Sequence, residues 1–359
     1  MTSPSLILGS TLVAFSPTLA LLVLIVSGKP QLVILAVCSA FAYLLSALCS
    51  SLFWLVTSAI IGKVGADDLV VTLLALAIPG VFCQLATRCL FVLGYFRVED
   101  VIRRSVARHE EETRIAAASS SSNGGVVVDD DDDDHNDDHA ETNALQLQLN
   151  DLSCSIASGT GYALLHSLFL YGTLLASESG EAANGYDDGG AYTGGGGSTG
   201  HGGTLYQPSC GGVPSLINGA LIACMFSILD VMWMMLCFFG MRRRYSSFRR
   251  GGPGHRPASS SYSGTMRALI RALAFRGLDE TWPGVGGDVG IAAICTVAIT
   301  HSMASLVLAP NILEDGCRIS LPCLGCVVVY VGIVLRGVMK GGKFLPDDQR
   351  KRIQGHTFV

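Results

Sequence analysis

The stretch Leu152–Ala176, LSCSIASGTGYALLHSLFLYGTLLA, contains no Asp, Glu, Lys or Arg. About 20 apolar residues in a helix span the hydrocarbon core of a bilayer, so this stretch predicts a membrane-spanning helix. Gly159, Ala163 and Ser167 recur at every fourth position and therefore share one helix face. Small side chains on one face let two helix backbones approach closely within lipid. We therefore expect these three residues to form a helix-packing face, whereas a second row that starts at Gly161 stops at once.

The composition of the chain indicates an integral membrane protein. Half of the 359 residues are apolar and 15% are charged, whereas soluble domains carry about 25% charged residues. The net charge of −5 comes largely from one Asp run. We expect membrane lipid, and no nucleic acid, as a partner. No two C-x-x-C motifs pair up as a structural zinc site would require. Cys210 and Cys317 fall in loops predicted outside the cytosol, where a disulfide can form between them.

The distribution of Lys and Arg predicts the orientation, because these residues accumulate in cytoplasmic loops. With the N-terminus lumenal or extracellular, 20 of the 24 Lys and Arg residues fall on the cytosolic side. Lys63 and Arg318 fall on the other side, and Arg88 and Arg336 fall within spans. We therefore predict an odd number of spans and a cytosolic C-terminus.

The apolar runs predict an all-α, polytopic membrane protein with seven transmembrane helices. We expect the acidic loop between the third and fourth spans to be disordered, because a block of like charges repels itself and buries no apolar surface. The predicted segments are 1–96 (spans one to three), 97–151 (disordered acidic cytosolic loop), 152–176 (span four), 177–212 (Gly-rich lumenal loop), 213–240 (span five), 241–287 (basic cytosolic loop), 288–339 (spans six and seven) and 340–359 (cytosolic tail).

Ionisable residues within the spans are costly in lipid and therefore point to function. One hypothesis is that they hydrogen-bond to one another or to neighbouring subunits and fix the register of the helices. The other is that His166, Asp230 and His301 bind a metal ion that activates water, as in a seven-span metal-dependent hydrolase. No two of these three residues share an H-x-x-x-H or H-x-x-x-D spacing, so such a site would need three separate helices. The polar residues within spans are Gln84, Arg88, His166, Asp230, His301 and Arg336.

The opening of the chain resembles that of the anterior-pharynx-defective 1 family. The residues that carry the resemblance are Gly9–Pro17 (GSTLVAFSP), Ala20-Leu21 and Gly28-Lys29-Pro30. The resemblance covers all seven predicted spans and neither long polar loop. Further matches in chain order are Trp54, Gln84, Arg88, Ser158-Gly159, Ala163, Ser167, Trp233, His301, Leu321-Pro322 and Gly341-Gly342.

That family is the polytopic scaffold subunit of the gamma-secretase complex. The resemblance implies a non-catalytic role without a cofactor, and it implies presenilin, nicastrin and presenilin enhancer as partners. It further implies that the presenilin aspartates cleave type I membrane proteins, such as Notch-like receptors and amyloid precursor-like proteins. The implied locations are the endoplasmic reticulum, Golgi, endosomal and plasma membranes.

The chain departs from the family pattern at two places. Ala163 and Ser167 replace two glycines of the family's tandem G-x-x-x-G, and both remain small. Asp230 stands where the family carries a histidine, three residues before Trp233. We expect His166, in the fourth predicted span, to take over part of that histidine's role.

A third hypothesis makes the chain itself an aspartyl protease of the presenilin type. That chemistry needs two aspartates at membrane depth, in Y-D and G-x-G-D motifs. The Y-D of this chain, Tyr186-Asp187, lies in the Gly-rich loop, and Gly286-Gly287-Asp288 lacks the spacing of the second motif. Because a lone buried Asp cannot form a dyad, we expect no such activity.

Overall fold

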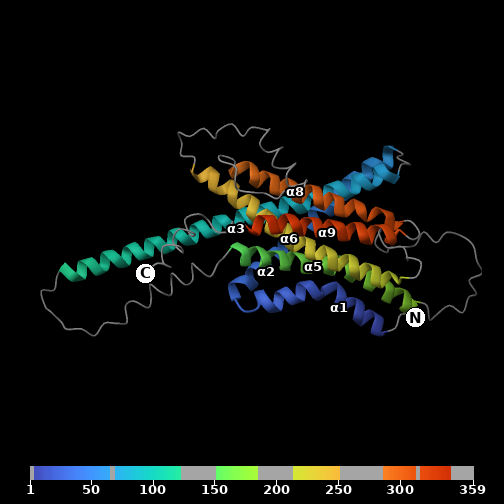
Figure 1. Cartoon of the computed structure of the whole chain (residues 1–359), viewed down its shortest axis with the longest axis horizontal. Helices are drawn as coiled ribbons and strands as arrows, with labels where there is room; N and C mark the ends of the chain where they lie inside the picture. The colour runs from blue at the N-terminus through green and yellow to red at the C-terminus, as the bar shows by residue number, and fades with distance from the viewer. Residues whose placement is uncertain are drawn as a thin grey trace, which may run out of the picture. The chain divides into compact units, whose positions relative to one another are not determined.

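The computed structural model describes residues 4–64, 69–122, 151–184, 213–250, 286–312 and 316–340 (Figure 1). These residues contain helices and no strand, and six of the helices are long and apolar enough to cross a membrane. The prediction of an all-α, polytopic membrane protein is therefore confirmed. The elements are α1 (Pro4–Leu21), η1 (Leu22–Val26), α2 (Pro30–Val64), α3 (Leu69–Ser122), α5 (Asp151–Asn184), α6 (Ser215–Arg250), α8 (Gly286–Val307), η3 (Ala309–Ile312) and α9 (Cys317–Lys340).

The stretch from which the fourth span was predicted forms α5, a helix of 34 residues. It is not among the six helices that meet the criterion of length and hydropathy within the described residues. Its Gly, Ser, Thr and His residues lower its mean hydropathy. The count of seven spans therefore stays a prediction.

Helix α3 corrects the expected boundary of the acidic loop. It continues to Ser122, so residues 97–122 are helical where we predicted disorder. This segment is rich in Arg, Glu and Ala, which favour helix, and its side chains bond to the backbone one turn earlier. Arg104 Nε donates to the Asp100 carbonyl at 3.2 Å, and Arg108 Nε donates to the Arg104 carbonyl at 3.3 Å. Residues 177–184 and 241–250, predicted as the starts of the two later long loops, likewise continue α5 and α6 as helix. The Asp run and residues 185–212 and 251–285 lie outside the described residues.

Helices α5 and α6 form the centre of one compact unit, which comprises the described residues of Met1–Cys89 and Asp151–Val359. The described part of Leu90–Asn150 forms a second unit. The two central helices lie side by side in Figure 1, and α6 also contacts α1, α8 and α9. Helix α5 contacts α1 and α2 on its other sides. Every residue of α6 from Trp233 to Met241 is buried, so α6 is the core helix of the bundle.

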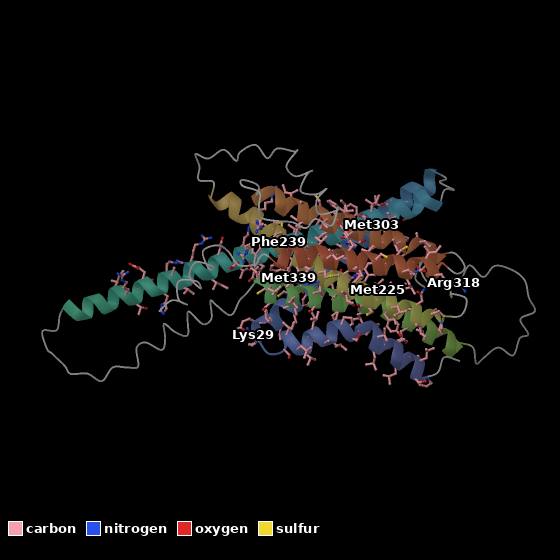
Figure 2. The ribbon with its side chains drawn as sticks, viewed as in Figure 1. Lys29, Met225, Phe239, Met303, Arg318 and Met339 are labelled. Carbon is pink, nitrogen blue, oxygen red and sulfur yellow. The ribbon has the colours of Figure 1, made fainter. Side chains whose placement is uncertain are left out.

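The two ends of this bundle differ in the number of basic residues named at them. Figure 2 places Lys29, Phe239 and Met339 at one end and Arg318 at the other. Helix α6 continues from Phe239 into three consecutive arginines, Arg242 to Arg244. The arginines of α6 therefore follow the end of the bundle that carries Lys29, which lies between η1 and α2.

Candidate functional site

Four ionisable side chains from four helices meet inside the bundle. Arg88 of α3 and Asp230 of α6 are fully buried, and Arg88 Nη2 donates to Asp230 Oδ1 in an ion pair. His166 Nδ1 of α5 lies 2.6 Å from the other carboxylate oxygen, Oδ2. Arg88 Nη1 lies 3.2 Å from Nδ1 of His301, which α8 supplies. We call these four residues the polar cluster.

The direction of each hydrogen bond follows from the groups involved. A guanidinium can only donate, so His301 Nδ1 accepts from Arg88 and the proton of that imidazole lies on Nε2. The carboxylate of Asp230 accepts at both oxygens, so His166 Nδ1 donates to it. The bonds thus form one chain from His301 through Arg88 and Asp230 to His166. This chain connects α8, α3, α6 and α5 through groups that lipid cannot solvate.

Aromatic rings enclose the guanidinium of Arg88. Its Cζ lies 4.3 Å from the ring centroid of Tyr162 and 5.2 Å from that of Trp233, within the range of cation–π attraction. Trp233 also stacks on His301, with ring centroids 4.4 Å apart and an interplanar angle of 28°. The Trp233 indole Nε1 donates to Thr300 Oγ1 at 2.9 Å. Trp233 therefore holds the His301 imidazole in place while its own polar atom is satisfied.

His166 has aromatic neighbours on two sides. Tyr43 of α2 stacks on its ring at 5.2 Å, and Phe226 of α6 meets it edge to face at 5.4 Å. Its imidazole is bonded to Asp230, the residue that stands where the resembling family has a histidine. That His166 takes over part of that histidine's role stays a prediction.

The predicted helix-packing face of α5 lies against α6 of the same chain. A Cβ at Gly159 would come 2.7 Å from Val231 Cα, so the two backbones are in close contact. One further turn along, Ala163 is fully buried. Ser167 Oγ lies 2.5 Å from Ser227 Oγ of α6. The approaching helix on this face is therefore internal to the chain.

A tighter contact lies on the other side of α5, where the sequence predicted none. A Cβ at Gly161 would come 1.9 Å from the carbonyl oxygen of Ala36 in α2. Nearby, Ser39 Oγ of α2 donates to the Ser158 carbonyl at 2.7 Å. The signal that could have found this contact lies on α2, where Ala36 and Ser39 place two small residues on one face.

Two other predicted polar positions do not join the polar cluster. Gln84 lies one turn before Arg88 on α3, and its backbone carbonyl receives a long contact of 3.5 Å from Tyr162 Oη. Arg336 is exposed on α9. The Tyr186-Asp187 pair lies outside the described residues. Cys317 is disulfide-bonded, but Cys210 also lies outside the described residues, so their pairing stays a prediction.

The arrangement of His166, Asp230 and His301 does not favour the metal-dependent hydrolase. The guanidinium of Arg88 contacts both Asp230 and His301, so a permanent cation already uses lone pairs that a metal would need. Within the parts of the chain that the structure describes, no group of three or more His, Cys, Asp or Glu residues could hold a metal ion.

Comparison with known families agrees with the resemblance of the opening residues. Residues 5–249 match the family described as Aph-1 protein. The chain belongs to the Aph-1 family. This family is a component of the gamma-secretase complex, an intramembrane protease, and the Aph-1 match extends from α1 to the end of α6. The match stops before α8 and so does not include His301. The similarity of His301 to a family residue depends on the resemblance of individual residues alone. No curated protein sequence matches the chain.

Proposed function

We propose that this Aph-1 protein is the non-catalytic scaffold subunit of a gamma-secretase-like intramembrane aspartyl protease. Its partners are presenilin, nicastrin and presenilin enhancer, and the complex cleaves type I membrane proteins such as Notch-like receptors and amyloid precursor-like proteins. The match over residues 5–249 carries this proposal. Catalysis comes from the presenilin aspartates, and the chain itself uses no cofactor.

The polar cluster supports a scaffold role because its groups bond to one another. Arg88 and Asp230 neutralise each other with no exposed surface, and the two imidazoles bond to the same pair. Such a closed set of bonds fixes the register of four helices in lipid, where apolar contact alone gives little preference for one register. A rigid bundle then offers fixed outer faces to the neighbouring subunits.

Seven spans with a lumenal or extracellular N-terminus fit the arrangement of α5 and α6. Arg242 near the end of α6 donates through Nε to Asp151 Oδ2, at the start of α5, at 2.8 Å. Tyr171 and Leu174, in the later part of α5, pack in one cluster with Leu216 at the start of α6. The two helices are therefore antiparallel along their shared length, which supports α5 as the additional span.

We infer the orientation from charge. Lys29 and Phe239 lie at the end of the bundle opposite Arg318 (Figure 2), and Arg242 follows Phe239 by three residues on α6. The positive-inside rule assigns the more basic end to the cytosol. A bundle with these features resides in the endoplasmic reticulum, Golgi, endosomal and plasma membranes, as the family resemblance implies.

Affinity purification of the tagged chain from membranes in mild detergent tests the scaffold role. We expect presenilin, nicastrin and presenilin enhancer to be identified by mass spectrometry, and to be lost with Gly159→Asp, which places a charge against Val231. The matched control is Gly325→Ala, because a Cβ at Gly325 would meet nothing within 4 Å. Both variants must insert into membranes at equal levels.

Metal analysis of the same samples distinguishes the alternative. A chain recovered without protease subunits and with stoichiometric zinc would overturn the scaffold proposal and indicate a metal-dependent membrane hydrolase. Loss of that zinc with His301→Ala would assign the site to the polar cluster.

A further inference from the structure

Three buried polar atoms of α2 and α3 take no part in the hydrogen bonds of the polar cluster. They are Ser46 Oγ, Gln84 Oε1 and Arg88 Nε, and none of them has a hydrogen-bond partner among the described residues. Ser46 and Arg88 have no exposed surface at all. Buried polar atoms in native proteins are bonded in the great majority of cases, to protein or to ordered water.

The residues that carry these atoms lie around one side chain, Tyr162 of α5. The Tyr162 hydroxyl reaches the Gln84 carbonyl at 3.5 Å, which is long for a hydrogen bond. The same hydroxyl lies within reach of the hydroxyls of Ser46 and Thr87, and Ser46 Oγ lacks the full geometry of a hydrogen bond. The Cζ of Arg88 lies over the Tyr162 ring at 4.3 Å. The region thus holds donors and acceptors from three helices that are close but poorly paired.

The helix positions explain why these groups converge. Gln84 and Arg88 are four residues apart and so lie on one face of α3. One turn earlier, a Cβ at Gly80 would come 3.2 Å from Ser50 Oγ of α2, so this face of α3 meets α2 closely. Ser46 precedes Ser50 by one turn of α2 and therefore faces the same way.

We propose that a buried water-binding site lies between α2, α3 and α5, formed by Ser46, Gln84, Arg88 and Tyr162. The bound water accepts from Arg88 Nε, donates to Gln84 Oε1 and exchanges hydrogen bonds with the hydroxyls of Ser46 and Tyr162. Four polar partners are within the number that buried waters use. This site is independent of the proposed function, since it depends on contacts within the chain.

The burial of the site selects water over larger occupants. Ser46, Arg88 and Tyr162 are fully enclosed by the chain itself, and Gln84 is half-buried with its Oε1 atom covered, so neither a lipid head group nor a side chain of another subunit reaches the polar atoms of the site. The water has a structural consequence, because it connects Arg88 to α2. Helix α2 supplies no ionisable side chain to the polar cluster, and the water extends the polar connections from four helices to five.

A high-resolution cryo-electron-microscopy map of the purified full chain, with or without bound subunits, tests the site directly. We expect isolated density within about 3 Å of Ser46 Oγ, Gln84 Oε1 and Arg88 Nε. Gln84 turned to bond Ser46 directly, with no density between the helices, would overturn the proposal. Density continuous with a lipid or with another subunit would overturn it too.

Thermal melting of the purified full chain gives a second, independent test. Ser46→Ala and Gln84→Met each remove one partner of the same water, so we expect the double variant to lower the melting midpoint no more than the stronger single variant. Additive shifts would show that the two side chains share no water. Ser39→Ala with Gln84→Met is the matched control pair and should be additive, because Ser39 Oγ bonds directly to the Ser158 carbonyl.

Discussion

Helices α2 and α6 are almost equally apolar, with mean hydropathies of 2.4 and 2.2 over their candidate spans, yet they occupy opposite environments. In the most apolar stretch of α6, 72% of the residues are buried, against 28% in α2. Helix α2 exposes Leu48, Leu52 and Phe53, whereas α6 buries Ser227 and Asp230. In a bilayer the apolar content of a segment indicates whether it crosses, and its buried polar groups indicate whether it lies inside.

The largest effect is expected from removing the buried carboxylate of Asp230 in α6. Asp230→Leu leaves Arg88 buried without its ion-pair partner, which costs about 3–5 kcal/mol in comparable buried pairs. Unfolding of the purified variant by denaturant titration in detergent measures the loss. A free energy of unfolding equal to that of the wild type would contradict the view that α6 is held by its polar groups.

A somewhat smaller effect is expected where α5 meets α2. Gly161→Ala places a Cβ 1.9 Å from the Ala36 carbonyl oxygen, and overpacking of this kind costs about 1–3 kcal/mol or more. Gly325→Ala is the control, since that position opens to free space, and it should leave the free energy of unfolding unchanged or slightly higher. Equal behaviour of the two variants would show that the inner face of α2 is not tightly packed.

The hydroxyl contact between α5 and α6 should contribute less. Ser167→Ala removes the bond to Ser227, and a typical intramolecular hydrogen bond contributes about 0.5–1.5 kcal/mol to stability. Ser51→Ala, on the exposed side of α2, removes a bond to that helix's own backbone and should have a smaller effect. If Ser51→Ala lowers the free energy of unfolding more than Ser167→Ala in the same assay, the contact with Ser227 is not a stabilising one.

The smallest effect is expected on the outer face of α2. Leu48 is 59% exposed, so Leu48→Ala should change the free energy of unfolding by no more than about 0.5 kcal/mol, as for other surface positions. A loss comparable to that of Gly161→Ala would place this face inside the bundle. Loss of protease subunits at unchanged stability would instead identify it as a subunit contact.

The helices and the membrane character could be predicted from the sequence, because apolar runs of sufficient length leave few other structures in lipid. The error at α3 arose from reading charge alone. Asp100 and Arg104 lie one turn apart in a segment of good helix formers, so residues 97–122 had a helical signal that the nearby Asp run obscured.

The ionisable residues of the polar cluster could also be found from the sequence, since charges within spans are rare and costly. Their pairing could not, because Arg88 and Asp230 lie 142 positions apart and their contact depends on how three-dimensional packing sets the register of separate helices. The contact at Gly161 was missed for the same reason. Its partner atom is a backbone oxygen, so the sequence signal was confined to the small residues Ala36 and Ser39 of α2.

The claim that the polar cluster makes this chain a scaffold is tested most directly by co-purification with a variant in which an apolar pair replaces the ion pair of Arg88 and Asp230. Tagged wild type, Asp230→Leu and the double variant Arg88→Met with Asp230→Leu are compared at equal amounts of inserted protein. We expect the protease subunits to be recovered with the wild type, lost with Asp230→Leu and largely regained with the double variant, because an apolar pair can replace a buried ion pair. Full recovery of the subunits with Asp230→Leu alone would contradict the account.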